Sequence, residues 1–189
     1  MRLCDWLVET NPRSIAEFKS DEDCHFLQLF AADVVSIHGF KMGFCPIIVI
    51  DSSHISSPYK GALFSASSYD VDDGLLAYGL FGLENYEDWL WFLQKLKGVV
   101  GEREVVTILD RHQSILCSVS EVFGSDYHAH FYHHIKENFN SFLTKHNIRG
   151  RKWKDNALEM LDVVAYAHLE CDYLVIMEML RMFNPNLAN

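Results

Sequence analysis

The sequence predicts an α/β fold in which helices cover a mixed β-sheet. Residues 46–51 and 105–110 are apolar, largely β-branched runs without polar alternation, which is typical of strands buried on both faces. Between them, residues 85–99 carry apolar side chains at helical spacing. Because strand and helix patterns alternate, the buried strands are expected to lie in a sheet beneath helices.

Two further strands are expected directly after the first buried run, at residues 61–68 and 75–83. The segment between them ends in Asp73-Gly74, which is a hairpin turn signal. Three successive strands therefore predict an antiparallel meander. The helix at 85–99 follows it, with acidic residues in its first turn and lysines near its end, as the helix dipole favours.

The second half of the chain continues the alternation. A short helix is expected around 115–122, a last strand at 127–132 and a helix at 135–142. Residues 156–183 contain no Gly or Pro and are predicted to be helical, ending before Pro185. We expect residues 1–45 to be a flanking segment, 46–142 the main domain, and 143–189 a basic linker with a helical segment.

Composition narrows the class of protein. The net charge of −10 argues against a free-standing nucleic-acid binder, and the longest apolar run is far shorter than the ~20 residues of a membrane-spanning helix. We expect a soluble, intracellular protein without a membrane partner. The 5 cysteines form no CxxC pair, so they are expected to be reduced and mostly buried.

Both buried strands end on a carboxylate, Asp51 and Asp110. The expected order β-β-β-α-β-α-β-α resembles an RNase H-like fold, a mixed five-stranded sheet, here with a C-terminal helical segment. In that fold the first and fourth strands are neighbours, which would set the two carboxylates side by side. Adjacent carboxylates repel unless they share a proton or a cation, so a divalent metal is the natural partner. The alternative for each aspartate is a turn or cap role.

Three motifs resemble the Mutator-like (MULE) transposase family, including its plant members. Residues 51–54 (Asp-Ser-Ser-His) followed by 59–61 (Tyr-Lys-Gly) resemble its first signature, and 109–112 (Leu-Asp-Arg-His) resemble its second. Between them, 84–93 resemble the start of a family helix with its Glu-Asn and tryptophans. The similarity in order and spacing runs from about residue 40 to 139.

The resemblance implies metal-dependent DNA cleavage and strand transfer by a DDE triad. Asp51 and Asp110 match its first two acids, and Glu170 lies in a segment similar to the one that holds the third. Glu159 and Glu178 compete for that role. Two ions about 4 Å apart would activate the attacking oxygen and stabilise the leaving one. Mg²⁺ or Mn²⁺ is the expected cofactor.

Several neighbouring residues are candidates for supporting roles. His54 and His112 follow the two aspartates and could orient them or contact phosphate, or lie on the surface. Arg111 could neutralise a carboxylate or contact DNA. His134 retains the histidine of a Cys-x-x-His pair that relatives carry, whereas Phe131 replaces the cysteine.

A zinc site is not expected, because that thiolate is missing. His128 and His130 would point to one face of a strand and could share an ion, with a polar strand face as the alternative.

One basic stretch could contact DNA. It contains five cationic residues and no acid before Asp155, although a solvated linker is an equal alternative. The residues are Lys145, Arg149, Arg151, Lys152 and Lys154. The expected partners are DNA and a second copy of the chain, and the expected location is the nucleus.

Relatives usually place a zinc-binding DNA-recognition module before this core and a SWIM finger after it, and neither is found between Met1 and Asn189. We therefore keep an alternative function open: a truncated or domesticated, non-catalytic module that binds DNA or protein, like transcription regulators derived from plant transposases.

Overall fold

The computed structural model describes residues 3–43, 45–56, 60–68, 74–110, 112–124, 128–145 and 151–183. The chain divides into two compact units, residues 1–130 and 131–189. Each unit is described by itself below.

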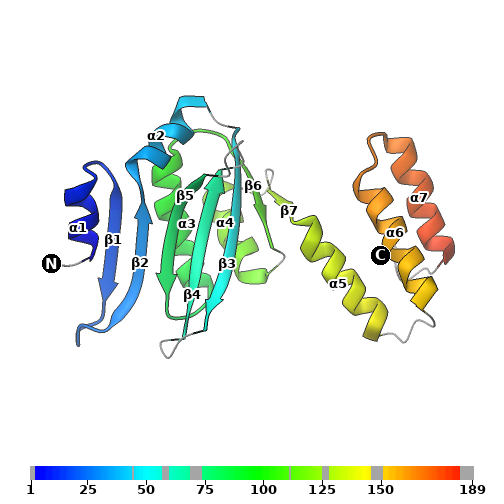
Figure 1. The fold of residues 1–189 in the computed structure, drawn as a ribbon, viewed down its shortest axis with the longest axis horizontal. Helices are drawn as coiled ribbons and strands as arrows, with labels where there is room; N and C mark the ends of the chain where they lie inside the picture. The colour runs from blue at the N-terminus through cyan, green and yellow to red at the C-terminus, as the bar shows by residue number, and fades with distance from the viewer. Residues whose placement is uncertain are drawn as a thin grey trace. The chain divides into compact units, whose positions relative to one another are not determined.

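The strands that the structure describes in the first unit form one seven-stranded mixed sheet in the order β1-β2-β5-β4-β3-β6-β7 (Figure 1). The strands are β1 (Ile15–Ser20), β2 (Phe26–Ala32), β3 (Ile47–Ile55), β4 (Gly61–Ser68), β5 (Leu75–Phe81), β6 (Val106–Leu109) and β7 (His128–His130). The predicted meander is confirmed, since β4 pairs antiparallel with both β3 and β5. The predicted neighbours β3 and β6 are also paired, and they run parallel.

The α/β class is therefore confirmed, but the sheet has seven strands where five were predicted. The extra strands, β1 and β2, extend the meander beyond β5. They escaped prediction for different reasons: β1 is the edge strand with a weak apolar pattern, whereas β2 pairs with both β1 and β5 and its short apolar run does not distinguish a strand from a helix. The second half of β1 is exposed, and so are Phe26 and Leu27 at the start of β2.

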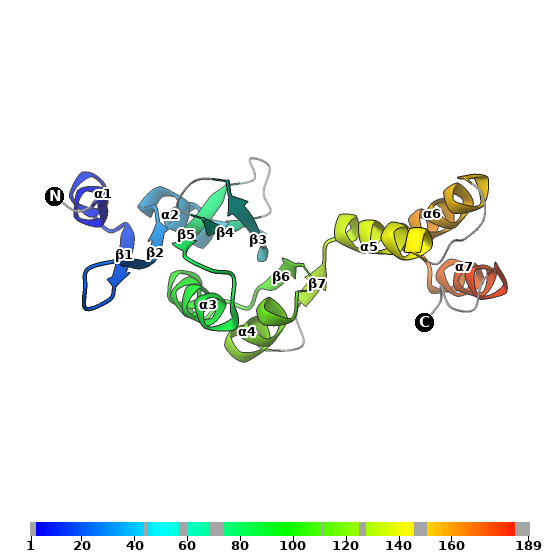
Figure 2. The same ribbon diagram turned by 90° about the horizontal axis from the view of Figure 1, so that it is seen from below.

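Four helices accompany the sheet in the described part of the first unit: α1 (Leu3–Thr10), α2 (Val34–Gly43), α3 (Tyr86–Val100) and α4 (Gln113–Phe123). Figure 2 shows α3 and α4 on the same side of the sheet. Alternate residues of β3 and β4, including Ile48, Ile50 and Phe64, are fully buried in the core that these helices help to enclose.

The predicted helix at 85–99 is confirmed as α3. It begins where predicted because the Asn85 side chain accepts a hydrogen bond from the Asp88 N–H, and it ends at Gly101, whose φ is 73°. As predicted, Trp89, Phe92, Leu93 and Leu96 are core residues, none more than 1% exposed. Trp89 stacks on Phe64 of β4, with ring centroids 3.7 Å apart.

The second unit is helical, with α5 (Tyr132–Lys145), α6 (Arg151–Ala165) and α7 (Glu170–Phe183). The predicted helical tail is interrupted after Ala165, so it forms a pair of helices that contact each other. A chain without Gly or Pro is not obliged to continue one helix. Here α7 starts afresh with the N–H groups of Asp172 and Tyr173 donating to the Leu169 carbonyl.

The cysteines differ from the sequence-based expectation. All five cysteines are free, but four are exposed and Cys4 is half-buried, so the prediction of buried thiols is wrong. Cysteine is favoured in cores without being confined to them. Among the described residues, no helix is long and apolar enough to cross a membrane.

Gly79 of β5 lies where the sheet leaves no room for a side chain. A Cβ atom there would come within 2.6 Å of the Phe81 ring and 2.8 Å of the Leu29 carbonyl oxygen. We expect Gly79→Ala to lower the free energy of unfolding by ~1–3 kcal/mol, as overpacking does. Urea denaturation measures the change.

Gly98 of α3 is the matched control, because a Cβ atom there meets nothing within 4 Å. Gly98→Ala should instead stabilise the protein by ~0.5–1 kcal/mol, since alanine is the better helix residue. Equal effects of the two substitutions would contradict the described packing of β5.

Candidate metal site on the sheet

Asp51 lies within β3 and is exposed. The prediction that the strand ends on this carboxylate is wrong, because β3 continues to Ile55 through an antiparallel ladder in which Asp51 pairs with Ser65. Burial alternates along the strand, with Ile48 and Ile50 in the core. Asp51 therefore points to the opposite sheet face from these residues.

Asp110 directly follows β6 and is half-buried. In the parallel ladder of β3 and β6, Ile47 pairs with Val106 and Val49 with Ile108. The ladder ends at this pair, and continuing its register by two positions would set Asp51 opposite Asp110 on the same sheet face. The spacing of neighbouring strands is ~4.8 Å. The first two predicted acids thus belong to neighbouring parallel strands or their ends, and their pairing around a metal stays a prediction.

A hard divalent cation suits this arrangement. Carboxylate oxygens are the ligands that Mg²⁺ prefers, and it commonly takes only one or two carboxylates while keeping several waters. Two aspartates side by side on one face meet that requirement. Within the described residues there is no group of three or more His, Cys, Asp or Glu side chains placed to hold a metal. The two aspartates would therefore need water or substrate oxygens to complete the coordination of a cation.

The Asp51 carboxylate is held by its own chain neighbour. The Ser52 N–H donates to Asp51 Oδ1 at 2.8 Å. On the other face of β3, the Ser52 hydroxyl donates to Glu84 Oε1 at 2.9 Å, and His54 Nε2 lies 3.8 Å from Glu84 Oε2. Sequence reasoning gave Ser52 and Glu84 no role. Both residues lie within the motifs that resemble the family, but nothing in the sequence pairs one with the other.

A pocket of about 280 Å³ adjoins this contact and is lined by His54, Lys60 and Glu84 together with apolar residues such as Ile55 and Leu83. His54 is highly exposed, so it is available to a ligand as well as to Glu84. His54 lies on the strand face opposite to the Asp51 carboxylate and contacts Glu84, so it does not orient that carboxylate directly; a contact with phosphate stays a prediction.

The other supporting residues are distributed over both units. His112 is the exposed N-cap of α4 and makes no side-chain cap hydrogen bond. Arg111 lies outside the described residues. His134 lies in α5 of the second unit, where its ring contacts Phe131 edge-on and its Nδ1 is 4.0 Å from Glu137 Oε2.

Glu170 begins α7 in the second unit and is exposed. Its competitors Glu159 and Glu178 lie in α6 and α7, and Glu178 accepts a contact from Arg181 at 3.4 Å. The choice of Glu170 as the third acid stays a prediction.

The basic stretch spans the end of α5 and the start of α6. Lys145 and Lys152 are exposed, whereas Lys154 donates to the Thr144 hydroxyl at 2.8 Å and so ties the two helices together. Arg149 lies outside the described residues, and Arg151 is the first residue of α6. Their role in DNA binding stays a prediction.

His128 and His130 of β7 lie on one face of the strand, as predicted, with ring centroids 5.8 Å apart. They pair in register with the buried residues Thr107 and Leu109. The Nδ1 atom of each ring is buried and makes no hydrogen bond in the described structure. Two imidazoles alone do not complete a tetrahedral zinc site.

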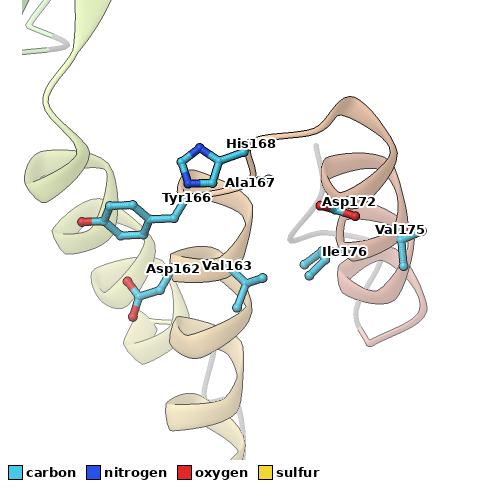
Figure 3. A pocket seen from close by; sticks show the side chains of 8 residues that line it. All are labelled: Asp162, Val163, Tyr166, Ala167, His168, Asp172, Val175 and Ile176. Atoms are coloured by element: carbon cyan, nitrogen blue, oxygen red, sulfur yellow. The ribbon is translucent and has the colours of Figure 1, made fainter.

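A larger pocket, about 530 Å³, lies between α6 and α7 within the second unit (Figure 3). Val163 faces Ile176 across it, and Asp162 lies on its rim. Asp162 is already engaged by Tyr132 and by Lys136, whose Nζ lies 2.6 Å from Oδ1. These two donors lower the pKa of Asp162. The pocket is mainly apolar and includes none of the predicted site residues.

The first unit is thus an α/β domain in which Asp51 lies within β3 and Asp110 directly follows the neighbouring parallel strand β6. Residues 47–138, nearly half of the chain, match the family model of the MULE transposase domain. This match supports the assignment of residues 47–138 to the MULE transposase family, as the motifs predicted. The match includes Asp51 and Asp110 and ends before Glu170. A comparison with curated proteins finds no match.

Proposed function

We propose that this chain is a transposase-derived, RNase H-like domain whose reaction is metal-dependent cleavage and transfer of DNA strands. The observation that carries the proposal is the parallel pairing of β3 with β6, whose register, continued by two positions, would set Asp51 beside Asp110. The family match supplies the substrate class, since transposase domains act on DNA.

The sheet supports the RNase H-like part of the proposal. Taken in chain order, the five strands from β3 to β7 lie as third, second, first, fourth, fifth, with the first and fourth parallel. This is the neighbour relation that the fold requires for its first two acids. β1 and β2 then extend the sheet beyond its third strand.

The roles of the residues follow from their chemistry. Asp51 and Asp110 would hold Mg²⁺ or Mn²⁺, and Glu170 is the proposed third acid. A bound ion of this kind activates the attacking oxygen and stabilises the leaving one in a phosphoryl displacement. Lys145 and Lys152, which are exposed, are proposed to contact phosphates in the DNA backbone. A nuclear location follows from a DNA substrate.

Plasmid nicking tests the activity. In Mn²⁺, the parent protein is expected to convert supercoiled plasmid to the nicked form, and Asp110→Asn to reduce the rate by at least ~100-fold, the scale of losing a group that stabilises transition-state charge. The rates are measured by gel densitometry over time.

Asp23→Asn is the control, because Asp23 is exposed in the turn between β1 and β2. It should nick as fast as the parent. A parent protein that binds plasmid without nicking it would support the non-catalytic alternative. Equal nicking by the parent and Asp110→Asn would show that the activity does not use this site.

A further inference from the structure

Glu84 lies between the end of β5 and the start of α3, one residue before the helix cap Asn85. Its side chain is 18% exposed, although it carries a carboxylate. A carboxylate with this little exposure needs hydrogen-bond donors to offset lost hydration. Among the described residues, two side chains of β3 contact it.

Those groups are Ser52 and His54, alternate residues on one face of the strand. The Ser52 hydroxyl donates to one carboxylate oxygen at 2.9 Å, and His54 Nε2 lies 3.8 Å from the other. Both residues project from the face of β3 that is opposite to the Asp51 carboxylate. Glu84 contacts the strand on that face.

Ser52 connects this contact to the candidate metal site. Its hydroxyl is held by Glu84, while its N–H donates to Asp51 Oδ1 at 2.8 Å. Ser52 therefore links the two carboxylates, contacting Glu84 through its hydroxyl and Asp51 through its N–H. Exposed carboxylates otherwise rotate among several positions, and ordering them costs conformational entropy when a cation binds.

Glu84 is itself anchored through its neighbour. The Asn85 side chain accepts from the Asp88 N–H and donates to Asp88 Oδ2, each at 2.9 Å. Asp88 Oδ1 accepts from Gln28 of β2 at 2.5 Å. Burial raises the pKa of Asp88, against these hydrogen bonds. The start of α3 is thus fixed to the sheet, and Glu84 with it.

We propose that Glu84 is a positioning residue for the metal-holding carboxylate of Asp51, acting through Ser52. This proposal rests on the proposed function, because it requires Asp51 to hold a cation. Groups that hydrogen-bond behind metal ligands contribute about 10–100-fold to metal affinity. The effect of Glu84 passes through one additional residue, so we expect the lower end of that range.

The test is Mn²⁺ affinity, measured from the electron paramagnetic resonance signal of the free ion, which needs no DNA and no activity. Glu84→Ala is expected to weaken binding by ~10-fold. Glu84→Gln keeps an oxygen that accepts from Ser52, and should bind within ~3-fold of the parent. Ser52→Ala should match Glu84→Ala, and the double variant should be no weaker than either, because both remove one interaction.

Glu87→Ala is the matched control, since Glu87 is an exposed acid in the first turn of α3. It should bind Mn²⁺ as the parent does. Melting curves without metal show which variants are folded, and Ser52→Ala tests the same contact if Glu84→Ala does not fold.

Including Asp51→Asn distinguishes a failure of the proposed role of Glu84 from a failure of the metal site itself. If Asp51→Asn loses Mn²⁺ binding while Glu84→Ala and Ser52→Ala bind as tightly as the parent, the role of Glu84 is overturned and the metal site stands. The role of Glu84 is likewise overturned if Glu84→Gln is as weak as Glu84→Ala. If Asp51→Asn binds like the parent, the proposed function and the role of Glu84 both fall.

Discussion

Trp89→Ala is expected to lower the free energy of unfolding by ~3–5 kcal/mol, the usual cost of removing a large buried aromatic side chain. Trp89 is 1% exposed and stacks on Phe64 with the ring planes only 4° apart. It also contacts Phe92 edge-on, at a centroid distance of 6.1 Å. Truncation would leave a cavity between α3 and the sheet. Guanidinium denaturation followed by circular dichroism measures the loss.

Trp6→Ala in α1 provides the comparison, because Trp6 is 50% exposed. It removes the same atoms from a surface position, where the effect should be within about 1 kcal/mol of zero. Equal destabilisation by the two substitutions would mean that α3 does not pack on the sheet through Trp89.

The central strands and α3 were predictable from the sequence because their patterns are local. β3 begins with an apolar run, β6 is a short β-branched run, and α3 has a cap at Asn85 and a regular apolar stripe. In such elements the local pattern and the tertiary packing agree. The edge strand β1 was not predictable because half of it is exposed, and β2 was not because its short apolar run fits a helix as well as a strand.

The end of β3 was misjudged for a related reason. Residues 51–54 are polar and read as a turn, yet they form a ladder with β4 through backbone hydrogen bonds that any side chain permits. The break between α6 and α7 was equally invisible, because it depends on the packing of the two helices and not on a Gly or Pro.

The residues of the candidate site were likewise only partly predictable from the sequence. Asp51 and Asp110 could be predicted, since each follows a buried run and the family motifs mark both. The contact between Ser52 and Glu84 joins residues 32 positions apart, so no local pattern reveals it. Glu170 lies in the second unit, beyond the residues that match the family model, and its role rests on similarity of one helical stretch.

Mn²⁺ is expected to stabilise the folded protein, because a cation that binds only the native state shifts unfolding by mass action. At about one hundred times its dissociation constant, the ion adds ~2.7 kcal/mol. For a chain of this size that raises Tm by roughly 5–10 °C. Asp51→Asn should abolish the rise. Without metal the variant should be at least as stable as the parent, since it removes repulsion between neighbouring carboxylates.

The most direct test is therefore the Mn²⁺-induced change in Tm of the parent beside that of Asp51→Asn, measured by scanning calorimetry. Asp155→Asn, an exposed aspartate in α6, controls for general loss of negative charge and should respond as the parent does. The proposed site predicts a rise of several degrees in the parent and in Asp155→Asn, and none in Asp51→Asn. An unchanged parent Tm at millimolar Mn²⁺, or an equal rise in Asp51→Asn, would contradict it.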